Sequence, residues 1–104
     1  MGGSGKTTTA AAVLEYINVN RSAHILTVED PIEIVFTPKK AFISQRNLGV
    51  DATTLAEAVK GAARQDPDVL YIGEMRDTET IRGALGAASS GALVISTMNS
   101  ANAA

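Results

Sequence analysis

The sequence contains no cysteine, no tryptophan and only one histidine, and aromatic residues make up 4% of its 104 positions. The absence of cysteine excludes a disulfide framework, a cysteine-ligated zinc site and a thiol nucleophile. No apolar run approaches the roughly 20 residues that a membrane-spanning helix needs. The N-terminus also lacks the basic and apolar regions of a signal peptide. We therefore expect a soluble cytoplasmic protein that does not insert directly into a membrane.

An excess of charge of one sign is missing as well. The 9 lysines and arginines nearly balance the 11 aspartates and glutamates, which gives a formal net charge of −2. This balance provides no electrostatic footprint for nucleic acid or for an anionic membrane. Hydrophobic residues make up 45% of the chain, which suffices for a packed core in a chain of single-domain length. The sequence therefore predicts a globular domain that does not bind nucleic acid.

Segments with helical and strand-like patterns alternate along the chain. Apolar periodicity, caps and breakers predict helices over residues 7–17, 54–65 and 78–88, and strands over residues 24–28, 32–36, 41–45, 69–72 and 93–96. The polar residues 18–22 are expected to end the first helix, and Thr54 and Asp77 to cap the other two. Phe42 and Tyr71 are expected in the core. This alternation is typical of a parallel α/β sheet that is covered by helices on both faces.

A glycine-rich segment opens the chain. Gly2-Gly3-Ser4-Gly5-Lys6-Thr7 matches the second half of the phosphate-loop pattern G-x-x-x-x-G-K-[ST], whose first glycine would precede Met1. In such a loop, small residues let backbone N–H groups converge on phosphate, and the following helix adds its positive end. Lys6 would reach the β- and γ-phosphates, and the hydroxyl of Thr7 would bind Mg²⁺. The alternative is a glycine-rich turn before an alanine-rich helix.

Acidic and polar residues follow the predicted strands at their carboxyl ends, where ligands of open α/β sheets bind. Glu74 follows the buried run 69–72 and would hold Mg²⁺ through water or polarise an attacking water. The alternative for Glu74 is an ordinary loop carboxylate. Thr97 and Asn99 follow the strand 93–96. In phosphate-loop ATPases with an extra strand between the loop strand and the acidic strand, a polar residue at this tip senses the γ-phosphate. The alternative for Thr97 and Asn99 is an ordinary polar strand end.

Glu29, Asp30 and Glu33 form an acidic group after the predicted strand 24–28. Three carboxylates so close together repel one another unless a cation or solvent screens them. Beside a nucleotide site they suit a metal shell or a general base. Taken alone, the same residues describe a solvated acidic turn.

Taken together, these motifs resemble the secretion ATPase superfamily of type II and type IV secretion systems, and most of all its type IV pilus retraction motors. Residues 3–8 resemble the phosphate loop of the family, 25–33 its Asp box, 43–46 the Gln-Arg segment that follows, and 64–69, 73–77 and 79–82 its Walker B box. The order and the spacing of the motifs also fit, and the resemblance spans nearly the whole chain.

The resemblance implies a role for each site residue. ATP would be bound by Gly3, Ser4, Gly5, Lys6, Thr7 and Thr8, and Mg²⁺ by Thr7 and Glu74. Glu33 would be the catalytic base and Glu74 the catalytic Walker B glutamate. Glu29 and Asp30 would shape the metal shell or the water network, and Thr97 and Asn99 would face the γ-phosphate.

The resemblance also implies a fold and partners. Residues 1–104 would form a partial RecA-like P-loop NTPase core, with a mainly parallel sheet that lacks the strand before the phosphate loop. The family works as hexameric rings, in which ATP hydrolysis acts on the inner-membrane platform protein of a pilus or secretion system. Its N-terminal domain and C-terminal helices have no counterpart in these residues, so we expect the middle of a larger ATPase domain.

Two residues depart from the family pattern. Ala92 and Asn99 stand where the His box of the family carries histidines, and neither titrates near pH 7. Three hypotheses therefore stay open. The chain is an ATP-hydrolysing motor core, a nucleotide-binding or assembly fragment without turnover, or a non-functional gene remnant.

Overall fold

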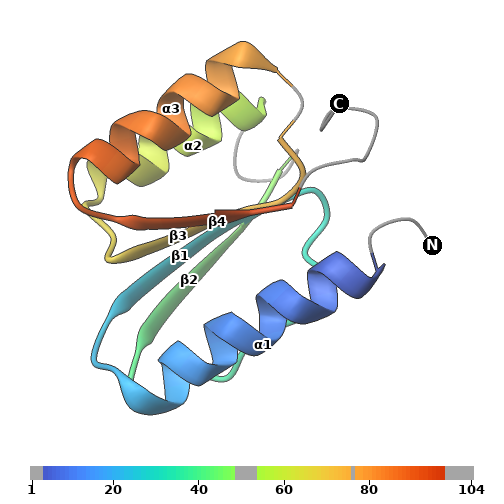
Figure 1. Ribbon diagram of the computed structural model, residues 1–104, viewed down its shortest axis with the longest axis vertical. Helices are drawn as coiled ribbons and strands as arrows, with labels where there is room; N and C mark the ends of the chain where they lie inside the picture. Colours follow the sequence, from blue (N-terminus) through green and yellow to red (C-terminus); the bar gives the residue numbers. More distant parts are fainter. Residues whose placement is uncertain (1–3, 49–53, 76, 98–104) are drawn as a thin grey trace.

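The computed structural model describes residues 4–48, 54–75 and 77–97. In chain order these residues form α1 (Ser4–Asn20), β1 (His24–Glu29), β2 (Phe42–Asn47), α2 (Leu55–Arg64), β3 (Val69–Ile72), α3 (Thr78–Ser89) and β4 (Leu93–Ser96). The strands are parallel and lie in the order β2-β1-β3-β4. Figure 1 shows α1 on one face of the sheet and α2 and α3 on the other. The prediction of a parallel α/β sheet with helices on both faces is confirmed.

The side chains of β1 and β3 alternate between two hydrophobic cores. The core under α2 and α3 contains the fully buried residues Leu26, Val28, Leu70 and Ile72. The core under α1 contains Ile25, Val69 and Tyr71, together with Leu14 and Ile17 of the helix. Because both faces of β3 are covered, its sequence Val69–Ile72 is a continuous apolar run. The predicted bounds of the strand over residues 69–72 and the core position of Tyr71 are confirmed.

The caps of α2 and α3 lie where the sequence predicts them. The Thr54 hydroxyl accepts a hydrogen bond from the Glu57 N–H at 3.1 Å, and the Asp77 carboxylate accepts one from the Thr80 N–H at 2.7 Å. The bond from Thr80 holds the pKa of Asp77 below its ordinary value. Within the described ranges, no helix is long and apolar enough to cross a membrane.

Asn18 explains why α1 continues beyond its predicted end at residue 17. The residue is 0% exposed. Its side-chain amide donates a hydrogen bond to the Thr37 carbonyl at 2.9 Å and accepts one from the Lys39 N–H at 2.9 Å. An asparagine after an apolar helical pattern predicts a stop, because its side chain competes for backbone hydrogen bonds. Here the side chain binds a segment that is distant in the sequence, so the helix does not end.

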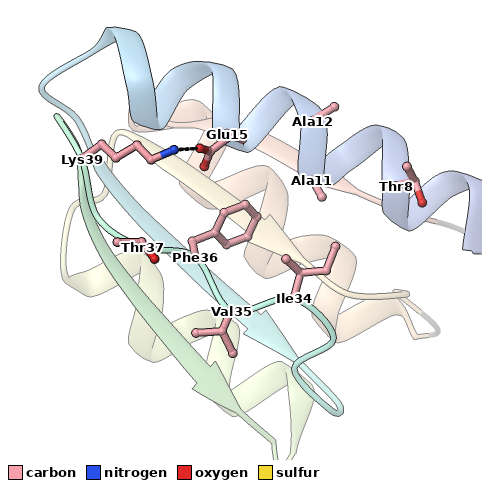
Figure 2. Close-up of a pocket in the computed structure, with 9 residues that line it drawn as sticks. All are labelled: Thr8, Ala11, Ala12, Glu15, Ile34, Val35, Phe36, Thr37 and Lys39. Carbon is pink, nitrogen blue, oxygen red and sulfur yellow. Dashed lines mark hydrogen bonds and ion pairs between the residues drawn. The ribbon is translucent and has the colours of Figure 1, made fainter.

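The prediction of a strand over residues 32–36 is wrong. Residues 30–41 form a crossover from the end of β1 to the start of β2 and contain neither helix nor strand. Figure 2 shows part of this crossover running alongside α1. Its backbone groups bind side chains instead of a neighbouring strand, as when the Phe36 N–H donates to the Gln45 side chain at 3.0 Å. An apolar run alone does not reveal which kind of partner its backbone has.

The strand predicted over residues 41–45 occupies Phe42–Asn47, and Phe42 does not lie in the core as expected. Phe42 is 66% exposed, because it begins the edge strand β2. Its ring packs against the ring of His24, with the centroids 5.2 Å apart.

Replacing Asn18 with alanine should lower the free energy of unfolding by about 1–3 kcal/mol, because the Thr37 carbonyl and the Lys39 N–H lose their partner. Asn20 of the same helix is a matched control, since its side chain binds the Tyr16 carbonyl at the exposed surface. Asn20→Ala should change the free energy by less than about 0.5 kcal/mol. Urea denaturation measures both values, and equal losses would contradict the role assigned to Asn18.

Candidate functional site

The carboxyl ends of the strands meet at one edge of the sheet. Val28 of β1 lies opposite Ile72 of β3, which in turn lies opposite Ser96 of β4. Figure 1 shows the first turn of α1 at the same end of the molecule. The first N–H groups of a helix have no partner within the helix and carry the positive end of its dipole. This carboxyl edge therefore favours an anionic ligand.

The structure describes only some of the residues predicted to bind phosphate. Gly3 and Asn99 lie outside the described residues. Of Ser4, Gly5, Lys6 and Thr7 the structure describes the backbone, which forms the first turn of α1. The helix therefore begins earlier than the predicted start at residue 7. Thr8, the next residue, is exposed.

Glu29 ends β1 as a buried acid that is 6% exposed. Its Oε2 accepts hydrogen bonds from the Thr27 hydroxyl at 3.0 Å and from the Gln45 amide at 3.5 Å. Its Oε1 accepts one from the Glu33 N–H at 3.5 Å. Burial raises the pKa of Glu29, these hydrogen bonds oppose the rise, and the charge of Glu33 adds to it. Glu29 therefore lies at the buried base of the acidic group and is not part of a solvated turn.

The other predicted acids lie nearer the surface. Asp30 and Glu33 are exposed on the crossover, and Glu74 is half-buried after Gly73. The Gly73 N–H donates to the Val28 carbonyl at 2.8 Å, which holds the turn before Glu74 beside the end of β1. Among the described residues, no group of three or more His, Asp or Glu side chains could hold a metal ion.

Tyr71 joins this polar group, although its sequence context indicates only a core residue. It is 5% exposed and lies in register with Thr27 of β1. Burial raises the pKa of Tyr71, the charges of Glu29 and Glu33 raise it further, and the Thr97 side chain lowers it. The Thr97 side chain therefore lies beside Tyr71. The sequence offers one sign that Tyr71 belongs to this polar group, because its hydroxyl is the only polar side-chain group in the buried strand 69–72.

A groove of about 450 Å³ lies between α1 and the crossover. Figure 2 shows Thr8 near one end and the ion pair of Glu15 and Lys39 near the other, with Ile34 and Phe36 between them. The bond to Lys39 lowers the pKa of Glu15. The groove is thus apolar along its middle. At the Thr8 end it approaches the first turn of α1, which carries the phosphate-loop residues.

A second cavity, of about 480 Å³, lies at the opposite edge, where the strands begin. Arg21 and Asp68 line it, and Asp68 already accepts a hydrogen bond from the His24 N–H at 2.8 Å. The α1 residues in its lining belong to the carboxyl end of the helix, whose dipole disfavours an anion. The carboxyl edge of the sheet is therefore the better candidate for a phosphate site.

The chain is similar to known proteins along its whole length. A family model described as "Type II/IV secretion system protein" matches residues 1–104. The "Type IV pilus retractation ATPase PilT" of Pseudomonas aeruginosa is 51% identical over 102 residues, which cover 98% of this chain and 30% of that protein.

Solved structures show the same similarity. The pilus retraction motor PilT with bound ADP matches with a TM-score of 0.87 at 50% identity, over 93% of this chain and 28% of that chain. The ATPase DotB of Legionella pneumophila matches with a TM-score of 0.88 at 34% identity, over 95% of this chain and 28% of that chain. The chain thus spans less than a third of the length of these relatives.

The raised pKa of Glu29 predicts how the stability changes with pH. When folding raises the pKa of an acid, the folded state holds the proton more tightly, so stability declines as the pH rises from the unfolded to the folded pKa. Glu29→Gln does not ionise. It should therefore gain stability relative to the wild-type chain as the pH rises from the ordinary glutamate value of 4.5 through the raised value. Unfolding free energies measured across this window check the prediction, and parallel curves for the two proteins would contradict it.

Proposed function

This chain belongs to the type II/IV secretion system protein family, and we propose that it binds and hydrolyses ATP as part of a secretion or pilus motor. One observation carries this proposal. The first turn of α1 and the acids that follow β1 and β3 lie at the same edge of the sheet. The solved relative with bound ADP supports an adenine nucleotide as the ligand.

The residues at this edge fit ATP and Mg²⁺. The first turn of α1 offers backbone N–H groups and a positive helix end to the phosphates. In the proposed site, Lys6 binds the β- and γ-phosphates, and Thr7 and Glu74 hold Mg²⁺. When bound, Mg²⁺ neutralises charge on the phosphates and orients them. The nucleotide contacts are completed by Gly3, Ser4, Gly5 and Thr8.

Glu33 is a better candidate for the catalytic base than Glu29. Both carboxylate oxygens of Glu29 accept hydrogen bonds from neighbouring groups, and the residue is 6% exposed. Glu33 is exposed on the crossover, where an attacking water has access to it. Glu29 then supports Glu33 from below, since it accepts the hydrogen bond from the Glu33 N–H.

The remaining predicted residues surround this pair. Asp30, exposed beside Glu29, orders water around the metal. Thr97 lies beside Tyr71 and, together with Asn99, faces the γ-phosphate in the proposed site.

Assembly into a hexameric ring is part of the proposal. Large apolar side chains are exposed on several parts of the described surface, among them Tyr16 on α1 at 68%, Val35 on the crossover at 83% and Leu85 on α3 at 63%. Apolar surface of this kind favours burial against a partner. The ring acts from the cytoplasm on the inner-membrane platform protein of a pilus or secretion system, as the family resemblance implies.

Nucleotide binding without turnover is the second candidate function. Ala92 stands where the family pattern has a histidine, and its side chain packs against the core under α2 and α3. Because alanine has no polar atom, a link from the γ-phosphate to a neighbouring subunit through this position is lost. A non-functional remnant has less support, because both faces of the described sheet carry a packed core.

Variants of two proposed site residues separate these functions. Lys6→Ala should abolish ATP binding, because it removes the proposed phosphate contact. Glu33→Gln should retain ATP binding and lower Mg²⁺-dependent phosphate release by about 10²–10⁴-fold, the usual contribution of a general base. Glu57→Gln replaces an exposed acid on α2, outside all of these motifs, and should change neither quantity. Titration with a fluorescent ATP analogue and a phosphate-release assay measure the two effects.

Each outcome favours one candidate. Equal phosphate release by the wild-type chain and by Glu33→Gln would contradict the role of Glu33. ATP binding by a wild-type chain that releases phosphate only at the background rate would favour the second candidate. If the wild-type chain shows no saturable binding, both candidates are wrong.

A further inference from the structure

Two amide side chains of β2 bind the backbone on either side of Glu33. The Asn47 Oδ1 accepts a hydrogen bond from the Ile32 N–H at 2.9 Å. The Gln45 Nε2 donates one to the Ile34 carbonyl at 2.8 Å. These two bonds hold the backbone groups immediately before and after Glu33.

Gln45 makes a second strong bond to the same segment. Its Oε1 accepts a hydrogen bond from the Phe36 N–H at 3.0 Å. This one side chain therefore binds both a backbone N–H and the Ile34 carbonyl, as a neighbouring strand would. Its Nε2 also lies 3.5 Å from the Oε2 of Glu29. Because residues 30–41 have no helix or strand of their own, these amides define the path of the crossover.

The register of β2 places both amides on the face of the sheet that carries α1. Gln45 pairs with Thr27 and Asn47 with Glu29, and alternate residues of a strand share a face. Amide side chains hold the segment without adding charge. A lysine or arginine at either position would instead place a positive charge beside the acidic group. The residue types therefore suit the support of a base.

We propose that Gln45 and Asn47 are positioning residues, which hold Glu33 in the geometry that its role as the base of ATP hydrolysis requires. This inference rests on the proposed function. A general base acts only within hydrogen-bond reach of the water that it deprotonates, and a displacement of about 1 Å can cost about 100-fold in rate. Gln45, in the segment 43–46 that the sequence singles out without a role, thereby acquires one.

Gln45→Met and Asn47→Leu test the inference, because each keeps the approximate size of the side chain and removes the amide. Each should lower kcat for ATP hydrolysis by about 10- to 100-fold and leave KM and ATP affinity unchanged. Amide hydrogen exchange should become faster at Phe36 in Gln45→Met and at Ile32 in Asn47→Leu. Ser44→Ala, on the same strand but in register with Leu26 of the opposite core, is the matched control and should match the wild-type chain in every measurement.

The outcomes distinguish this inference from the proposed function. If the wild-type chain hydrolyses ATP and Gln45→Met retains its kcat, the positioning inference alone is overturned. If kcat and ATP affinity fall together while exchange becomes faster throughout β1 and β2, the amides only support the fold, and the inference is again overturned. If the wild-type chain has no turnover, the proposed function is wrong and the inference falls with it.

Discussion

The structure depends on how the crossover over residues 30–41 satisfies its backbone hydrogen bonds. Parallel strands are usually connected through a helix, which supplies its own backbone partners. Here the side-chain amides of Asn18, Gln45 and Asn47 supply several of them. A buried backbone group that loses its partner costs about 1–3 kcal/mol, so these amides define one path for a segment that is otherwise free to take many.

That path determines which acids are buried and which face solvent at the carboxyl edge. Glu29 is drawn under the crossover, where burial raises its pKa and hydrogen bonds from Thr27 and the Glu33 N–H oppose the rise. Glu33 is exposed on the crossover above it. The buried acid costs stability at neutral pH, whereas Glu33 is exposed to solvent. Stability and the proposed activity are therefore coupled through one short segment.

The features that the sequence predicts correctly depend on local patterns. The buried run 69–72 and the caps at Thr54 and Asp77 need no distant partner. Residues 32–36 are mispredicted as a strand because their partners are side chains from elsewhere in the chain. Asn18 indicates a helix stop for the same reason. The acidic group is recognised as a candidate site, but which of its members is buried depends on the register of β1 with its neighbours.

The central claim is that the carboxyl edge of the sheet binds the nucleotide, and an NMR titration of the chain with MgADP tests it most directly. The account predicts that amide shifts change in the first turn of α1, over residues 29–33 and at Glu74. Changes confined to the cavity at the opposite edge, near Arg21 and Asp68, would contradict it, as would a spectrum that MgADP leaves unchanged.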